Sequence, residues 1–251
     1  MSKITSVFQI SGGVGGSTLA HHLAHINYVQ NPQRLLVNMA LTDSGHLLAK
    51  LGYEHYDRHS IEVSSIFDNQ TTIYSLSVDV GMEGNAPVGL LPTDDPFNWV
   101  LPTIPSPKYS AGWTSYDDEI AWRLALLQMI MRHQSFDIIV DGGVLLPDRF
   151  SLHNYIFEAS DVVLLLLATP ADVDVALNDI KLNLEVIRPV LVGEEMARLR
   201  PDVERRFETK RTLLMPHNDA IHSVLAQNLV LTPNRKTAGY IGMLREIVEG
   251  E

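Results

Sequence analysis

The chain has 251 residues, no cysteine and a formal net charge of −11, and 45% of its residues are hydrophobic. A chain of this length and composition suits one large domain with a substantial core. The absence of cysteine excludes disulfides, thiolate zinc sites, cysteine nucleophiles and iron–sulfur ligation. Non-specific affinity for nucleic acids comes from attraction between protein cations and phosphates. A chain with this net negative charge is therefore not expected to bind nucleic acid through its surface as a whole.

Membrane insertion is not expected either. The longest apolar run, Val162 to Ala168, is far shorter than the roughly 20 residues that span a bilayer. The first residues indicate a strand that leads into glycines rather than a signal peptide. The last helical stretch is amphipathic but acidic, which is the wrong sign for lying on anionic lipid. We therefore expect a soluble cytoplasmic protein without a membrane partner.

Short β-rich runs alternate with helical stretches, which is typical of βαβ units on a parallel sheet. Strands are expected at 3–10, 35–39, 72–80, 88–91, 136–140, 161–168 and 211–215. Helices are expected at 17–29, 44–51, 60–67, 117–133, 173–187, 219–226 and 236–248. The predicted fold is a single α/β domain over 1–251, doubly wound around a mostly parallel sheet.

Two segments interrupt this pattern. Residues 85–117 carry six prolines with aromatic residues between them, and prolines at that density disfavour both helices and central strands. This irregular loop is either packed down on the surface or serves as a lid or partner-binding loop. Residues 188–211 are locally basic and expected to be helical. They form either a solvated helix face or a docking surface for DNA or an acidic partner.

The segment most informative about function is Ser11 to Thr18, with the sequence SGGVGGST, between the first expected strand and the first expected helix. Glycines in such a place let backbone N–H groups turn around an anion, and the helix N-terminus adds partial positive charge. Ser17 stands where a hydroxyl would bind Mg²⁺. The placement and composition together indicate a phosphate-binding loop.

Here the sequence resembles the ParA/MinD family of partition and positioning ATPases, P-loop proteins whose loop reads K-G-G-x-G-K-[ST]-T. The resemblance continues in Phe136 to Asp141, similar to the family's strand Y-D-x-I-[IL]-[IV]-D, in Asp161 to Pro170, and in Leu214 to Asp219, similar to the I-P-x-D segment. It implies ATP or ADP with Mg²⁺, and no iron–sulfur cluster. The residues it assigns to the nucleotide are Gly12, Gly13, Val14, Gly15, Gly16, Ser17, Thr18, Pro216 and Asn218, and those it assigns to the metal are Ser17 and Asp141.

The departures from the family motif fall on its charged residues. Ser11 and Gly16 stand where the motif has lysines, and an ungapped count places Asn38-Met39-Ala40 on the family's D-x-D. In the family one lysine holds the β- and γ-phosphates, the other reaches the nucleotide of a dimer partner, and the second aspartate prepares the attacking water. Because phosphoryl transfer depends on positioning and charge stabilisation, we expect no useful hydrolysis and assign no catalytic residue.

Three hypotheses follow. The first is a ParA/MinD-like homodimeric scaffold that does not hydrolyse ATP and docks a protein partner of a segregation, conjugation or secretion system, with DNA contact through 188–211. The second is an atypical ATPase in which an arginine, such as Arg34 or Arg149, or a partner supplies the missing charge. The third is a regulator whose loop binds another anionic ligand.

Overall fold

The structure is a computed structural model that describes residues 3–25, 34–38, 78–79, 98–101, 137–145, 150–178, 184–216, 235 and 237–249. Its strands are β1 (Ile4–Gln9), β2 (Arg34–Asn38), β3 (Val78–Asp79), β4 (Asn98–Leu101), β5 (Asp137–Val144), β6 (Val162–Leu167), β7 (Ile187–Val192) and β8 (Leu213–Met215). Its helices are α1 (Gly16–His25), α6 (Phe150–Ala159), α7 (Pro170–Asn178), α8 (Gly193–Arg198), α9 (Arg200–Arg206) and α11 (Ala238–Glu249), with a 3-10 turn at Leu184–Val186.

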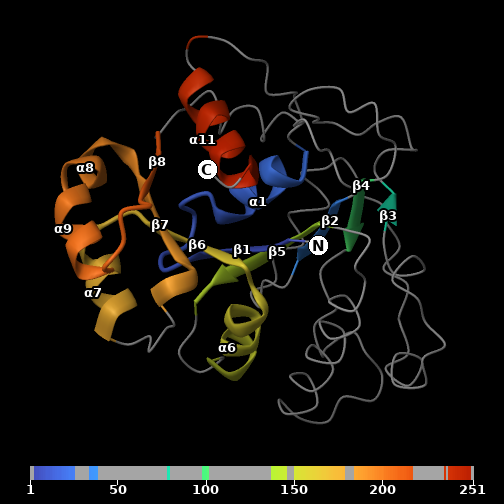
Figure 1. Cartoon of the computed structure of the whole chain (residues 1–251), viewed down its shortest axis with the longest axis horizontal. Coiled ribbons are helices and arrows are strands. Elements are labelled where there is room, and N and C mark those ends of the chain that lie inside the picture. The colour runs from blue at the N-terminus through green and yellow to red at the C-terminus, as the bar shows by residue number, and fades with distance from the viewer. Residues whose placement is uncertain are drawn as a thin grey trace.

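The strands form one eight-stranded sheet in the order β3-β4-β2-β5-β1-β6-β7-β8. Neighbouring strands pair in parallel, except that β3 runs antiparallel to β4. Figure 1 shows α1 and α11 over one face of the sheet and α6 on the opposite face. The expected doubly wound, mostly parallel α/β fold is thus confirmed.

The core lies on both faces of the central strands. Every residue of β6 is buried, as is typical of a parallel strand covered by helices on both sides. On one face, Leu19 of α1 and Leu244 of α11 pack in a single apolar cluster with residues of β1, β6 and β7. On the other, the ring of Phe8 lies 4.8 Å from that of Phe157 in α6, centroid to centroid.

Several expected elements occupy nearly the bounds read from sequence: the strands at 3–10, 35–39, 161–168 and 211–215 and the last helix at 236–248. The first helix, expected at 17–29, is described from Gly16 to His25, and the rest of its expected range lies outside the described residues. Only Val78 and Asp79 of the strand expected at 72–80 are described, as β3. The expected helices at 44–51, 60–67, 117–133 and 219–226 and the strand at 88–91 lie outside the described residues. In the described part of the chain, no helix is long and apolar enough to cross a bilayer.

The expectation that the prolines of 85–117 prevent a central strand was wrong at Asn98–Leu101. These four residues form β4, which lies between β2 and β3 in the sheet. Pro96 and Pro102 flank the strand and none of its own residues is proline, so every residue of β4 has an N–H to donate. The prolines therefore bound the strand rather than prevent it.

The expected helix at 173–187 was wrong at its end. Helix α7 ends at Asn178, and Ile187 begins β7, so the basic segment 188–211 opens as a strand and not as a helix. The run Ile187–Val192 is rich in β-branched residues and lies between β6 and β8, where its apolar side chains are buried. Helices α8 and α9 occupy only the later part of the segment.

Candidate functional site

The glycine loop lies at the middle of the sheet. It connects β1, which pairs with β5 on one side and β6 on the other, to α1. From β1 the chain passes through α1 to β2 on one side, whereas β6, β7 and β8 lie on the other. The carboxyl end of β1 is therefore at the point where the winding of the sheet reverses, and ligands of open α/β sheets bind at such points.

The loop backbone turns through two glycines in the left-handed region. Gly13 and Gly15 have φ angles of +78° and +101°, which residues with a Cβ adopt only with strain. Gly12 and Gly13 are exposed, whereas Thr18 is buried. The N–H of Leu19 donates to the carbonyl of Gly15 over 2.9 Å and closes the first turn of α1. The residues predicted at 12–18 thus form one continuous loop and helix start.

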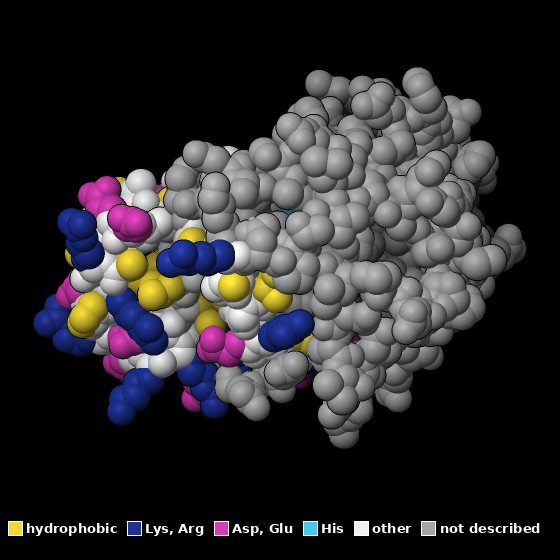
Figure 2. Space-filling model, turned by 90° about the horizontal axis from the view of Figure 1, so that it is seen from above, with side chains coloured by type: hydrophobic (Ala, Val, Ile, Leu, Met, Phe, Trp, Pro, Cys, Tyr) yellow, Lys and Arg dark blue, Asp and Glu magenta, His cyan; other side chains and the backbone are white. Residues whose placement is uncertain are grey.

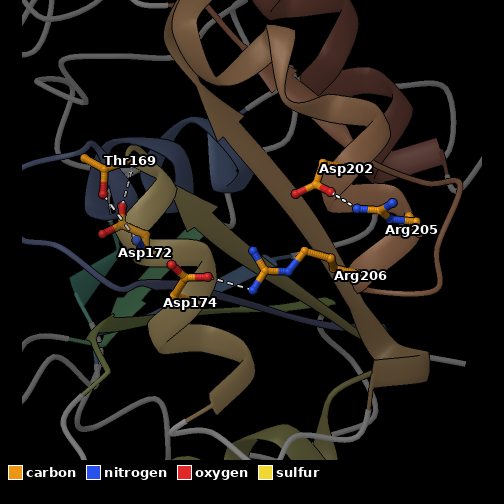
Figure 3. Close-up of polar contacts among 6 residues, drawn as sticks. All are labelled: Thr169, Asp172, Asp174, Asp202, Arg205 and Arg206. Atoms are coloured by element: carbon orange, nitrogen blue, oxygen red, sulfur yellow. Dashed lines mark hydrogen bonds and ion pairs between the residues drawn. The ribbon is translucent and has the colours of Figure 1, made fainter.

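Ser11, at the first lysine position of the motif, is bound within the chain. Its hydroxyl donates to Oδ1 of Asp172 over 2.6 Å. The other carboxylate oxygen of Asp172 accepts the N–H groups of Ala168 and Thr169, at 2.7 and 3.0 Å. In return Oγ1 of Thr169 accepts the N–H of Asp172 (Figure 3). This reciprocal pair is a capping box at the start of α7, and Ser11 ties the glycine loop to it.

Gln9, the last residue of β1, occupies the other end of the loop. Its side-chain oxygen accepts the N–H of Gly16 over 3.0 Å, and only 8% of the residue is exposed. A Cβ built on Gly16 would lie 2.8 Å from that oxygen and 3.2 Å from the carboxamide carbon. The second lysine position of the motif is therefore a glycine against which the Gln9 side chain packs.

The end of β8 reaches the same loop. A Cβ on Gly15 would lie 3.1 Å from the terminal methyl of Met215, and Met215 is buried. Pro216 follows directly after β8 and is exposed, so this predicted nucleotide residue lies at the edge of the sheet that carries the loop. Asn218 lies outside the described residues.

Asp141, the predicted support of the metal, lies inside β5 rather than after it. The expectation that the strand ends at Val140 with a glycine cap was wrong, because β5 continues to Val144 through a bulge. The pairing with β1 skips Gly142, and the Phe8 ring occupies the space that a Cβ on Gly142 would need, 2.2 Å away. The Asp141 carboxylate is fully buried and accepts the N–H of Gly143 over 3.2 Å.

Ser17, the other predicted metal ligand, is the second residue of α1, which packs against β5. Asn38, in the motif's first D-x-D position, pairs in register with Asp141, whereas Ala40 lies outside the described residues. No group of three or more histidine, aspartate or glutamate side chains in the described segments is placed to hold a metal ion.

The candidate DNA surface at 188–211 is partly neutralised by neighbouring carboxylates. Arg200 pairs with Glu204 at 2.7 Å, Arg205 with Asp202, and Arg206 of α9 reaches Asp174 of α7 at 2.7 Å (Figure 3). The described face in Figure 2 accordingly shows dark-blue side chains interspersed with acidic and hydrophobic ones rather than one basic field. The exposed cations of the segment without such an ion pair are Arg198, Lys210 and Arg211.

A second group of charges lies at the opposite, amino edge of the sheet. Lys3 donates through Nζ to the carbonyl of Ile247 near the end of α11, over 2.9 Å. Burial, and secondly the charge of Arg188, lower the pKa of Lys3. Arg34 begins β2, in register with Asp137 at the start of β5. That register places Arg34 at the amino edge, away from the glycine loop, and Arg149 lies outside the described residues.

No protein-family model and no curated protein sequence matches this chain. Several solved structures do match this chain. The chain superposes over its full length on MinD in the MinC:MinD cell division complex of Aquifex aeolicus, with a TM-score of 0.64, 14% identity and 96% of that chain covered. It also superposes fully on a ParA family ATPase from Chlorobium tepidum TLS, with a TM-score of 0.61, 12% identity and 100% covered.

A third match is the ATP complex of a McdA variant from Cyanothece, with a TM-score of 0.62 and 13% identity. It covers 99% of this chain and 95% of that one. This chain has the fold of the MinD and ParA P-loop ATPases. At such identities the likeness shows the fold and does not transfer ligands or activity.

That fold implies a nucleotide with magnesium at the glycine loop, yet the side chains around the loop do not fit nucleotide phosphates as they lie. The Gly16 N–H is already bound by Gln9, and Ser11 brings a hydroxyl committed to Asp172 instead of a cation. Asp141 is fully buried, and its carboxylate accepts the N–H of Gly143. The loop turns through two glycines with positive φ, and the Gln9 and Ser11 side chains beside it are hydrogen-bonded within the chain.

Sequence reasoning missed three residues of this site: Gln9, Asp172 and Met215. The motif T-x-x-D at Thr169 to Asp172 was a readable capping signal, although nothing in it pointed to Ser11. A polar residue at the buried end of a strand marked Gln9. Met215 lies in the segment similar to I-P-x-D, directly before the predicted nucleotide residue Pro216, but its contact with Gly15 comes from tertiary packing.

Proposed function

We propose that this chain is a ParA/MinD-like positioning or partition protein that does not hydrolyse ATP and works as a scaffold. The fold supports the family-like role, since its solved likenesses are cell division and partition proteins and a McdA protein. The loss of hydrolysis is inferred from the residues at the two positions where the family motif has lysines. Neither Ser11 nor Gly16 brings a cation, and each is engaged in a hydrogen bond within the chain.

The magnitude of this loss argues against turnover. Removing one preorganised group that stabilises transition-state charge costs about 10²–10³ in rate, and this chain lacks both cations of the motif. Catalysis of phosphoryl transfer rests almost entirely on positioning the reactants and on stabilising the charge of the transition state. An arginine would have to restore the charge, and Arg34 begins its strand at the wrong edge of the sheet for that role.

The scaffold would act as a homodimer and dock a protein partner of a segregation or secretion system. The ion pairs of Arg200, Arg205 and Arg206 favour a protein partner over DNA on the α8–α9 side, because only unpaired cations neutralise phosphates. Any nucleotide or other anion at the glycine loop would serve regulation rather than chemistry.

Phosphate release from MgATP tests the proposal, measured with the wild-type protein at micromolar concentration and with the matched variant Ser17→Ala. We expect wild type to release phosphate at the rate of the buffer blank. Release above the blank that Ser17→Ala abolishes would overturn the proposal in favour of an atypical ATPase. Release that survives Ser17→Ala comes from a contaminating enzyme.

The positioning role has its own readout. A fluorescent fusion expressed in the native host should gather at defined places in the cell, and light scattering of the purified protein should give twice the mass of the chain. A fusion spread evenly through the cell, together with a monomeric mass, would contradict the scaffold.

A further inference from the structure

The Gln9 side chain is placed as a ligand of the glycine loop. Its carboxamide oxygen lies 3.0 Å from the Gly16 nitrogen and accepts that N–H in a buried setting. The bond joins the residue at the end of β1 to the first residue of α1, and so closes the base of the loop. N–H groups of such loops are the donors that hold phosphate oxygens.

The space that Gln9 fills is the space in which a side chain at position 16 would begin. A Cβ on Gly16 meets the Gln9 oxygen at 2.8 Å, closer than Cβ atoms approach their neighbours. A lysine at position 16 and the Gln9 side chain in its present place therefore exclude each other. Glycine at 16 is what admits Gln9 to the loop.

The electrostatics of this contact oppose a second acceptor. A carboxamide oxygen carries partial negative charge and is an acceptor only. A phosphate brought to the same N–H would meet that oxygen and find the donor already used. To bind there, the anion must first displace Gln9 from a buried hydrogen bond, and the fraction of molecules with Gln9 displaced reduces the apparent affinity.

We propose that Gln9 is a resident ligand of the glycine loop, which holds the loop closed in the absence of nucleotide and gates the entry of a phosphate-bearing anion. The inference rests on the proposed function in taking the loop as the anion-binding element, but it does not depend on whether ATP is hydrolysed.

Two variants of Gln9 test the gate in opposite directions. Gln9→Ala removes the resident acceptor and should bind inorganic pyrophosphate roughly tenfold more tightly than wild type, which is the worth of one such hydrogen bond. Gln9→Glu keeps the shape and adds negative charge, and should bind pyrophosphate more weakly than wild type. Isothermal titration with pyrophosphate measures both without any turnover.

Asn154→Ala is the matched control. Asn154 donates a side-chain hydrogen bond to Glu158 over 3.1 Å on α6, on the face of the sheet opposite α1, and its loss should leave pyrophosphate binding unchanged. Circular dichroism and thermal melting establish that each variant is folded. If Gln9→Ala does not fold, the comparison of Gln9→Glu with wild type still decides the direction.

The outcomes separate this inference from the proposed function. Equal pyrophosphate affinity in wild type and folded Gln9→Ala, or no binding by either up to several millimolar, would overturn the gate. Tighter binding by Gln9→Glu than by wild type would do the same. ATP turnover by wild type would overturn the proposed function and leave the ranking of the Gln9 variants as an independent test.

Discussion

The hydroxyl of Ser11 donates to Oδ1 of Asp172 over 2.6 Å and so joins the glycine loop to the first turn of α7. The partners are 161 residues apart in the chain. Asp172 also accepts two backbone N–H groups and is only 3% exposed. One carboxylate therefore serves both the helix cap and the loop, and its removal leaves three donors unsatisfied at the carboxyl edge of the sheet.

Asp172→Ala should lower the free energy of unfolding by about 1–3 kcal/mol, because it removes a capping-box acceptor and leaves part-buried donors unpaired. Urea denaturation measures the change. The control is Asp174→Ala in the same helix, which removes only the exposed pair with Arg206 and should cost less than about 1 kcal/mol. Equal losses of unfolding free energy in the two variants would show that the capping hydrogen bonds of Asp172 stabilise the protein no more than the exposed ion pair of Asp174 does.

The central strands and the glycine loop were predictable because their signals are local. β6 is a continuous apolar run, and a glycine-rich segment lies between β1 and a helix. β7 was not predicted, because the apolar pattern of the helix expected at 173–187 extends to Ile187 and because Pro189 disfavours a strand inside a sheet. What no local pattern encodes is which distant side chain meets the loop. Gln9, Asp172 and Met215 reach it through the order of the strands.

The bulge in β5 gives a second prediction. Gly142→Ala places a methyl 2.2 Å from the Phe8 ring, and Phe8 is held by Phe157 of α6. We expect a loss of about 3 kcal/mol or more in the free energy of unfolding, at or beyond the upper end of typical overpacking costs. Gly239→Ala is the control, since its added Cβ meets nothing within 4 Å on α11, and it should gain up to about 1 kcal/mol. A similar effect of both variants would contradict the packing of Phe8 against Gly142.

The buried pair of His22 and Tyr240 holds α1 against α11. The Nδ1 of His22 lies 2.8 Å from the Tyr240 hydroxyl, and both side chains are fully buried. Tyr240→Phe should cost about 1–3 kcal/mol, because it removes a fully buried hydrogen bond between α1 and α11. Tyr155→Phe, at a half-buried position of α6, is the control, and an equal, small effect of both would contradict the role of the pair.

Burial also raises the pKa of Tyr240 far above its usual value of 10.0. Above that pH the unfolded chain releases the proton and the folded chain keeps it, so this group makes the folded state less stable as pH rises. Ultraviolet absorbance should therefore show fewer ionised tyrosines in the folded protein than in urea at the same alkaline pH. In Tyr240→Phe the number of ionised tyrosines should differ less between the folded protein and the protein in urea. If the variant and wild type show the same difference, the Tyr240 hydroxyl is not buried as described.

Lys3 has the opposite pH signature. Burial, and secondly Arg188, lower its pKa below 10.5, so between the folded-state value and 10.5 the unfolded state binds more protons. The stability contributed by Lys3 should rise with pH across that window and be constant below it. Urea denaturation at a series of alkaline pH values should show the free energy of unfolding of wild type rising relative to that of Lys3→Met as pH increases. A difference that does not change with pH would contradict the half-buried placement of Lys3.

The measurement that tests the account most directly is a crystal structure of the wild-type protein grown with millimolar MgATP. We expect any bound nucleotide to keep its γ-phosphate, Ser11 to remain bound to Asp172, and any phosphate oxygen on the Gly16 N–H to be accompanied by displacement of the Gln9 side chain. ADP in place of ATP, or a phosphate on that N–H with the Gln9 oxygen still within hydrogen-bond distance of it, would be the contradicting result.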